Sequence, residues 1–253
     1  MIGTGIGAVI FDFNGVLVDD ENVHFALFQE VLAQEGVAIT ERDYHERYLG
    51  YDDRKCFETA LADAGRSSDR QRLDGLIARK ARRYVEVAEQ GLRFFPAAAE
   101  TLGTVASRWP VAICSGALRP EIEYALRRLD RLGQVAAIIS AEDTDKCKPD
   151  PEGYRLALAA LRAHARNRRG RGPGQEEETP LDLASGHCLV VEDSLAGIIS
   201  AKGAGMKAVG VAQTYGETEL VGAGADAILA DLNHLTPEWV DRMFGAVEQR
   251  NEH

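Results

Sequence analysis

The feature that most constrains the fold is an alternation of short apolar segments with longer amphipathic ones. The apolar segments span residues 8–11, 111–114, 136–139, 189–191, 208–211 and 227–229. Each has the length of a buried strand, and most of the chain between them carries apolar residues at helical spacing. Strands that alternate with helices form a parallel sheet covered by helices. We therefore predict an α/β fold with a doubly wound parallel sheet.

One long stretch after the first strand holds no strand of its own. Residues 19–92 contain segments with helical spacing at 21–34, 41–48, 54–64 and 69–90. A helical block inserted into an alternating pattern is a candidate for a separate domain. We expect a helical domain at 19–92 and a sheet domain made of residues 1–18 and 93–253.

The charge of the chain limits its partners. Its 253 residues carry 29 Lys and Arg against 40 Asp and Glu, a net charge of −11. This argues against binding to nucleic acid or to an anionic membrane surface. Apolar runs stay well short of the roughly 18 residues of a membrane span, and residues 1–7 lack the basic region of a signal peptide. The four cysteines are scattered without a CxxC spacing, so we expect free thiols and a cytoplasmic protein.

Residues 166–185 differ in composition from the rest of the chain. They are rich in Arg and Gly, then in Glu, and show no periodicity. We predict a mobile surface loop here. The acidic run at 176–178 argues against a contact between the neighbouring arginines and nucleic acid.

Polar residues follow several of the predicted strands. Asp12, Ser115 and the pair Glu192-Asp193 stand at strand ends, and Lys148 lies in the loop after the third strand. The carboxyl ends of parallel strands converge on one crevice, where α/β folds bind their ligands. Three carboxylates in one crevice repel one another unless a cation such as Mg²⁺ lies between them. A nucleophilic carboxylate, a hard cation and a lysine together suit phosphoryl transfer.

This set of residues resembles the haloacid dehalogenase superfamily, above all its helical-cap phosphatases and phosphomutases of the β-phosphoglucomutase type. The four motifs that carry the resemblance occur in order, as residues 12–19 (Asp-Phe-Asn-Gly-Val-Leu-Val-Asp), 113–116 (Ile-Cys-Ser-Gly), 146–151 (Lys-Cys-Lys-Pro-Asp-Pro) and 192–194 (Glu-Asp-Ser). The resemblance covers nearly the whole chain. It implies a Rossmann-like core domain and identifies residues 19–92 as an α-helical cap domain.

The resemblance implies a role for each polar residue near the phosphate. Asp12 is the nucleophile and forms an aspartyl-phosphate, while Ser115 and Gly116 bind the phosphoryl group. Lys148 orients Asp12 and neutralises charge. Lys148 is preferred to Lys146 because only Lys148 directly precedes the run 149–151 (Pro-Asp-Pro).

The same resemblance implies Mg²⁺ as the cofactor. Asp12 and Asp193 are then direct ligands of the metal, together with the main-chain carbonyl of Asn14. Glu192 lies in the outer shell of the same site.

Asn14 departs from the family pattern, because phosphatases and mutases of this type carry a second Asp two residues after the nucleophile. That Asp protonates the leaving oxygen and then activates water, which an amide cannot do. Three explanations stand side by side. The protein is a slow or narrow phosphatase, His24 or Glu21 supplies the proton, or the chain is a variant that traps substrate or phospho-enzyme.

Two residues of the helical domain are candidate substrate contacts. His24 matches a histidine at the cap hinge of the family, and a polar residue on a cap helix is the plainer interpretation. Arg54 is a candidate for binding a distal phosphate, although it stands one residue later than expected after Gly50. An exposed Arg at the start of a helix explains it as well. This shift, and Asn14, weigh against a sugar phosphomutase.

The leading hypothesis is a Mg²⁺-dependent phosphatase that acts on a small phosphorylated metabolite. The alternative from another class is a non-catalytic protein that binds or traps such a metabolite in the same crevice. A metal-independent dehalogenase is a third interpretation, against which the acidic pair at 192–193 argues.

Overall fold

The computed structural model describes residues 5–49, 51–169 and 183–245. It contains a six-stranded, all-parallel sheet in the order β3-β2-β1-β4-β5-β6. The strands are β1 (Ala8–Phe11), β2 (Val111–Cys114), β3 (Ala137–Ile139), β4 (Cys188–Glu192), β5 (Lys207–Val211) and β6 (Ala227–Leu229). The predicted α/β fold with a parallel sheet is confirmed, and every predicted strand ends within one residue of the observed one.

Strand β1 lies at the centre because its whole length is apolar and can be buried on both faces. Val9 pairs with Val111 of β2 on one side and with Leu189 of β4 on the other. The chain adds β2 and β3 to one side of β1, then crosses over and adds β4 to β6 to the opposite side. The carboxyl ends of β1, β2 and β4 therefore lie next to one another at the point where the strand order reverses.

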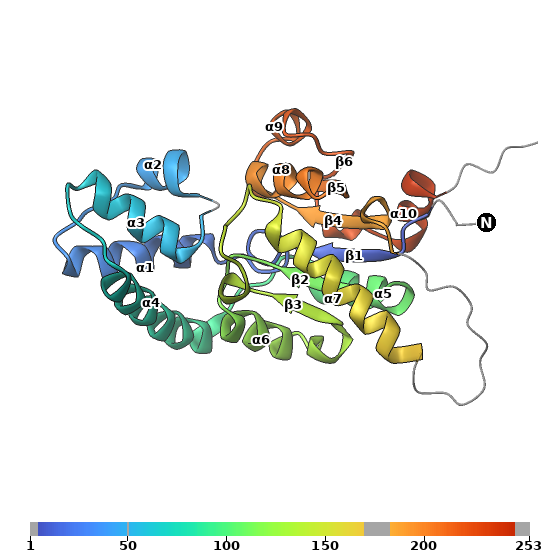
Figure 1. Ribbon diagram of the computed structural model, residues 1–253, viewed down its shortest axis with the longest axis horizontal. Coiled ribbons are helices and arrows are strands. Elements are labelled where there is room, and N and C mark those ends of the chain that lie inside the picture. The colour runs from blue at the N-terminus through green and yellow to red at the C-terminus, as the bar shows by residue number, and fades with distance from the viewer. Residues whose placement is uncertain (1–4, 50, 170–182, 246–253) are drawn as a thin grey trace, which may run out of the picture.

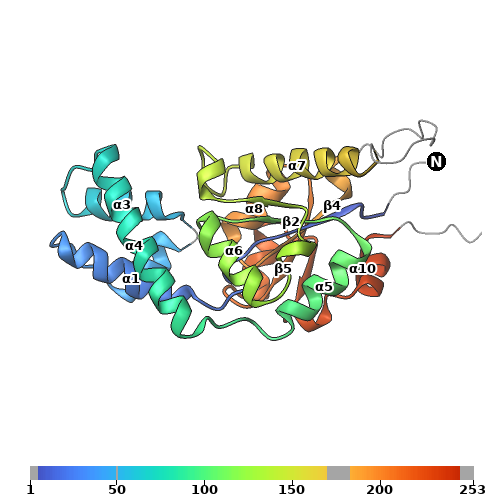
Figure 2. The ribbon, with the colours of Figure 1, turned by 90° about the horizontal axis from the view of Figure 1, so that it is seen from below.

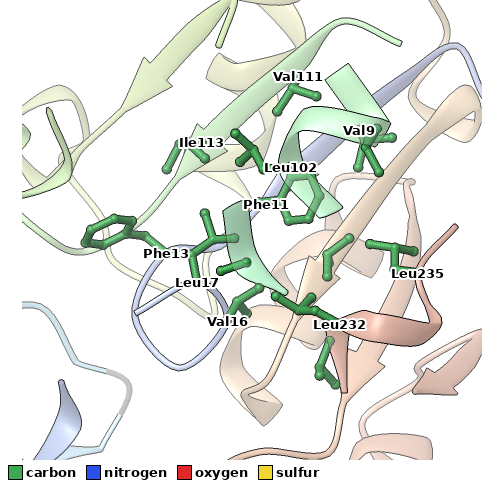
Figure 3. Packing of buried hydrophobic residues seen from close by; sticks show 14 of the residues in the cluster. Val9, Phe11, Phe13, Val16, Leu17, Leu102, Val111, Ile113, Leu232 and Leu235 are labelled. Carbon is green, nitrogen blue, oxygen red and sulfur yellow. The ribbon is translucent and has the colours of Figure 1, made fainter. Parts of the chain in front are cut away.

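Helices cover both faces of the sheet (Figure 2). Helices α5 (Ala98–Arg108), α6 (Arg119–Arg128) and α10 (Pro237–Phe244) pack on one face, and α7 (Glu152–Arg169), α8 (Leu195–Gly203) and α9 (Glu217–Gly222) on the other. Alternate residues of β1 serve the two faces. Val9 and Phe11 pack with Leu102 of α5, as Figure 3 shows, and Ile10 packs on the α7 side.

The helical insertion forms a separate body beside the sheet (Figure 1). It consists of α1 (Glu21–Gln34), α2 (Glu41–Asp43), the π-helix η1 (Tyr44–Tyr48), α3 (Asp53–Asp63) and α4 (Arg70–Gly91). Its own apolar core includes Phe28, Leu32, Phe57 and Leu61. We refer to this body as the cap and propose 19–92 as its bounds. The two segments that connect the cap to the sheet domain lie side by side, because the backbone amide of Asp19 donates to the carbonyl of Arg93 at 3.0 Å.

Two expectations for local structure need comment. The predicted helix 41–48 is a single α-turn that continues as a π-helix. The predicted loop 166–185 begins too early, since α7 continues to Arg169. Ala and Arg favour a helix even where no apolar face demands one. Most of the predicted loop, residues 170–182, lies outside the described residues. Leu183, which comes next in the chain, is buried against the apolar core.

Other expectations concern the thiols and the membrane. All four cysteines are free, as predicted, and three of them are buried. Over the described ranges, no helix combines the length and the apolar character that crossing a bilayer requires.

Candidate active site

The polar residues predicted from the strand ends meet at one edge of the sheet. Asp12 follows β1, Ser115 follows β2, and Glu192 ends β4. Lys148, from the loop after β3, reaches across them. Its Nζ donates to Asp12 Oδ1 at 2.7 Å and to Glu192 Oε1 at 2.5 Å. Burial alone would lower the pKa of Lys148, but these two carboxylates raise it well above its usual value, so the lysine stays charged.

A cavity joins this edge of the sheet to the cap. Asp12, Ser115, Gly116, Lys148 and Asp193 all line it. The Ser115 hydroxyl accepts a hydrogen bond from the backbone of Ala117 at 3.1 Å and donates to Asn14 Oδ1 at 3.3 Å. The hydroxyl therefore lies within the same group of side chains as the carboxylates.

Three carboxylates crowd together at the bottom of the site. Asp12, Glu192 and Asp193 each offer an oxygen within 4.8 Å of the others, and all three are buried. Burial and the neighbouring Glu192 raise the pKa of Asp12 to about 7, although Lys148 opposes this. Burial and the other two carboxylates raise the pKa of Asp193 well above its usual value. A divalent cation among them would relieve this repulsion, so the residues fit a metal.

Glu192 differs from the other two because both of its oxygens already have donors. Oε1 accepts from Lys148 and from the Tyr154 hydroxyl at 3.0 Å. Oε2 accepts from the backbone amides of Asp193 and Ser194 and from the Ser194 hydroxyl, each at 2.9 Å. Glu192 thus shapes the loop that carries Asp193, and Asp12 and Asp193 are better suited to hold an ion directly.

Two glycines allow these carboxylates to lie so close to the backbone. Gly15 has a φ of +75°, and a Cβ there would overlap the carboxylate of Asp193. A Cβ on Gly197, in the first turn of α8, would overlap the carboxylate of Glu192. Both positions therefore need a residue without a side chain.

Asn14 is bonded to the cap through Asp20 and lies beside His24. Its Nδ2 donates to the two oxygens of Asp20 at 2.9 and 3.0 Å and lies 3.1 Å from His24 Nε2. The Tyr84 hydroxyl also donates to Asp20, at 2.6 Å. Burial would raise the pKa of Asp20, but His24 and the hydrogen bonds from Asn14 and Tyr84 lower it, so the carboxylate is ionised.

His24 is held between Asp20 and a buried lysine of α4. Lys80 Nζ lies 2.7 Å from His24 Nδ1 and donates to Asp53 Oδ1 at 2.5 Å. An ammonium can only donate, so His24 Nδ1 is the acceptor in this contact. The ring proton of neutral His24 is then on Nε2, which lies 3.3 Å from Asp20 Oδ2.

The structure does not bring Arg54 to the cavity. Its guanidinium donates to Asp74 at 2.5 Å on the outside of the cap, and about half of each side chain is exposed. The preceding residue, Asp53, lines the cavity in its place. His24, the other predicted contact from the cap, does line the cavity.

The sequence interpretation missed several residues of this region, chiefly Asp20, Asp53 and Lys80. One signal for Lys80 was present. The buried face of α4 runs through Leu73, Leu76, Lys80 and Tyr84, so a lysine stands in an otherwise uncharged stripe. A charge on a buried helix face demands a partner and is a sign of a polar network.

The model of the haloacid dehalogenase-like hydrolases matches residues 9–211, which is most of the chain. The chain belongs to this family. The resemblance seen in its four motifs is thereby confirmed, and the protein is a hydrolase of the haloacid dehalogenase superfamily.

Curated relatives in the superfamily align along most of this hydrolase. The validoxylamine A 7'-phosphate phosphatase of Streptomyces hygroscopicus subsp. limoneus is 28% identical, over 89% of this chain and 94% of the relative. The phosphorylated carbohydrates phosphatase of Thermotoga maritima is 29% identical, over 88% and 93%. The β-phosphoglucomutase of Bacillus subtilis is 28% identical, over 91% and 92%.

Solved structures share the fold of this hydrolase. The β-phosphoglucomutase of Clostridium difficile superposes with a TM-score of 0.77 at 20% identity, covering 94% of this chain and 97% of that one. CbbY from Rhodobacter sphaeroides, solved in complex with phosphate, gives a TM-score of 0.76 at 23% identity, covering 93% and 99%. These likenesses extend to the cap as well as the sheet.

Proposed function

We propose that this hydrolase is a Mg²⁺-dependent phosphatase that cleaves the phosphate monoester of a small metabolite through an aspartyl-phosphate on Asp12. The observation that carries the proposal is the shared cavity in which Asp12 lies beside Ser115, Lys148 and Asp193. The names of two relatives, phosphatases of validoxylamine A 7'-phosphate and of phosphorylated carbohydrates, support it. The four free thiols support work in a reducing compartment such as the cytoplasm.

The reaction has two steps at phosphorus. A carboxylate oxygen of Asp12 attacks the phosphorus atom, and the bond to the leaving alcohol oxygen breaks. Water then attacks the same phosphorus, which releases phosphate and restores the carboxylate. Ser115 and the backbone at Gly116 bind phosphoryl oxygens, and the Lys148 ammonium offsets their charge while it holds Asp12 at 2.7 Å.

Asp12, Asp193 and the main-chain carbonyl of Asn14 are the groups that would hold Mg²⁺. Bound there, Mg²⁺ would supply positive charge for the transferring phosphoryl group. Glu192 keeps the surrounding groups in place, because it bonds Lys148 on one side and the backbone of the Asp193 loop on the other.

Asn14 leaves this site without the usual proton carrier. We propose that turnover is slow and favours esters whose leaving oxygen needs little protonation. Glu21 and His24 line the same cavity and are the groups from which a proton could come. Of the two, His24 is the more constrained, because Lys80 occupies its Nδ1.

The test is hydrolysis of p-nitrophenyl phosphate, an ester with a good leaving group, in Mg²⁺ and in excess chelator. We expect slow release of nitrophenol that requires Mg²⁺ and returns when Mg²⁺ is added back. Hydrolysis that is unaffected by the chelator would contradict the metal dependence.

Asn14 also favours one second candidate, a protein that binds or traps a phosphorylated metabolite without turnover. A binder would be stabilised against thermal unfolding by a phosphate ester and would release no phosphate. Measuring thermal unfolding and phosphate release on the same protein samples therefore distinguishes a phosphatase from a binding protein.

A further inference from the structure

The Asp193 carboxylate has a hydroxyl partner in the loop that follows β5. Strands β4 and β5 are neighbours in the sheet, where Glu192 pairs with Gly210. Asp193 comes directly after β4, and Thr214 lies three residues beyond the end of β5. The carboxyl ends of adjacent parallel strands lie at the same edge of the sheet, so the two loops can meet. The Thr214 hydroxyl donates to Asp193 Oδ2, and both residues line the cavity.

This hydroxyl is the one hydrogen-bond donor to the Asp193 carboxylate among the residues that the structure describes. Gly15 lies against the same carboxylate, since a Cβ at Gly15 would overlap Asp193 Oδ2. The Gly15 amide, however, donates to the carbonyl of Val18 at 2.9 Å. Gly15 therefore leaves room for the carboxylate, and Thr214 fixes its orientation.

The Thr214 hydroxyl is not used to begin the helix that follows it. Gly216 is the N-cap of α9, and its amide donates to the side chain of Glu219 at 3.0 Å. At the start of the loop, the amide of Ala212 donates to the carbonyl of Leu229 at 2.8 Å. The chain is thus anchored on both sides of Thr214, and the hydroxyl serves Asp193.

We propose that Thr214 is a positioning residue for the metal. Its hydroxyl holds one oxygen of Asp193 and leaves the other oxygen for the divalent cation that Asp12 and Asp193 would hold. For the presence of that cation, this inference rests on the proposed function. Carboxylates that bind metals are themselves hydrogen-bonded, and loss of such a partner typically weakens metal binding about 10–100-fold.

The experiment measures metal binding in the absence of substrate, so its result does not depend on catalysis. Mn²⁺ is the probe, because it takes the same oxygen ligands as Mg²⁺ and its electron paramagnetic resonance signal distinguishes free from bound ion. Thr214→Val keeps the shape of the side chain and removes the hydroxyl. We expect the dissociation constant of Mn²⁺ from the full chain to rise about 10–100-fold. An unchanged constant would overturn the proposal.

Two further variants show whether the hydroxyl itself is responsible. Thr214→Ser keeps a hydroxyl and should bind Mn²⁺ nearly as tightly as the parent. Thr218→Val removes a hydroxyl from an exposed position in the first turn of α9 and should leave the constant unchanged. If Thr214→Ser binds as weakly as Thr214→Val, or if Thr218→Val weakens binding to the same extent, the proposal is wrong.

The Mg²⁺ requirement of p-nitrophenyl phosphate hydrolysis gives a second readout. The Mg²⁺ concentration for half-maximal hydrolysis should rise in Thr214→Val by about the same factor as the dissociation constant of Mn²⁺. A Thr214→Val variant that hydrolyses the ester more slowly but needs no more Mg²⁺ would show a role in structure alone and contradict the proposal.

The failure of this inference and of the proposed function give different results. If the parent hydrolyses p-nitrophenyl phosphate and Thr214→Val binds Mn²⁺ as tightly as the parent, only the positioning role is wrong. If Thr214→Val binds Mn²⁺ more weakly but the parent hydrolyses no ester, the positioning role stands and the phosphatase proposal fails.

Discussion

Asn14 stands where a proton carrier is expected, and its contacts suit an amide. Its Nδ2 donates to Asp20 at 2.9 and 3.0 Å, and its Oδ1 accepts from Ser115 at 3.3 Å. A carboxylate at the same place would meet the ionised carboxylate of Asp20. The neutral amide of Asn14 thus makes good hydrogen bonds with its neighbours. The site lacks a side chain at this position that can donate and accept a proton.

The first prediction concerns Asn14→Asp. Two carboxyl groups about 3 Å apart share a proton, so the new Asp would be protonated near neutral pH and able to act as a general acid. We expect the turnover number for an alkyl phosphate ester such as glycerol 2-phosphate, whose leaving oxygen needs protonation, to rise about 10²–10⁴-fold, measured as phosphate release. Asn233→Asp, at an exposed position, is the control and should leave turnover unchanged. An unchanged rate in Asn14→Asp would show that the missing proton carrier does not limit turnover.

Sequence reasoning found the residues whose positions follow from the sheet. Asp12, Ser115 and Asp193 come directly after strands, and the ends of parallel strands converge whatever the details of packing. It did not find the contact between Lys80 and His24, which are 56 residues apart. Their meeting depends on how α1 packs against α4, and no local pattern encodes that packing.

At the scale of elements, β4 and α8 are fitted to each other through a carboxylate. Glu192 at the end of β4 occupies the space beside Gly197, while Ser194 caps α8 by accepting from the Gly197 amide at 3.0 Å. The capping hydroxyl also donates to Glu192 at 2.9 Å. The start of α8 therefore cannot accept a side chain at residue 197 without moving Glu192.

The second prediction compares two glycines in helices. Gly197→Ala should lower the free energy of unfolding by about 1–3 kcal/mol, because its methyl group displaces Glu192. Gly75→Ala is the matched control in α4, where a Cβ meets nothing within 4 Å. It should raise the free energy of unfolding by roughly 0.5–1 kcal/mol, since Ala is the better helix former. Urea denaturation measures both changes, and a Gly197→Ala variant as stable as the parent would contradict the close fit.

The elements that the sequence predicted are those with a continuous apolar run, such as 8–11 and 111–114, or with apolar residues at helical spacing, such as 21–34. Helices α9 and α10 were missed because they are short, although α10 carries a Thr236 cap followed by Pro237. The extension of α7 to Arg169 was missed although α7 is long. Its last turns are polar, and helix propensity rather than an apolar face stabilises them.

At the scale of the whole molecule, the cap meets the sheet domain through charged side chains as well as apolar ones. Glu121 of α6 is 2% exposed, and one of its oxygens, Oε1, has no hydrogen-bond partner among the residues that the structure describes. Burial raises the pKa of Glu121 to about 7, and Asp53 adds to this, although Lys80 opposes it. Side chains of the cap thereby influence the protonation of a residue in the sheet domain, which the sequence could not indicate.

The third prediction is a pH dependence of stability due to Glu121. The ordinary pKa of a glutamate is 4.5 and that of Glu121 is about 7, so between these values the unfolded chain loses a proton that the folded chain keeps. Stability from this group therefore falls as the pH rises from about 4.5 to about 7 and then levels off.

Glu121→Gln removes this pH dependence, because the amide does not titrate. Relative to the parent, the variant should become progressively more stable to unfolding as the pH rises from about 4.5 to about 7, and the difference should stay constant above pH 7. Glu123→Gln, on the same helix with a more exposed side chain, should show no such growth. A flat difference for Glu121→Gln would contradict the raised pKa.

The central claim is that Asp12 is the nucleophile of a Mg²⁺-dependent phosphatase, and Asp12→Asn tests it most directly. The measurement is the rate of p-nitrophenyl phosphate hydrolysis with Mg²⁺ present, with Asp241→Asn, half-exposed on α10, as the control. We predict that Asp12→Asn lowers the rate at least about 10³-fold while the control keeps it. A folded Asp12→Asn variant that retains a rate within about tenfold of the parent, far above what loss of a nucleophile allows, would contradict the claim.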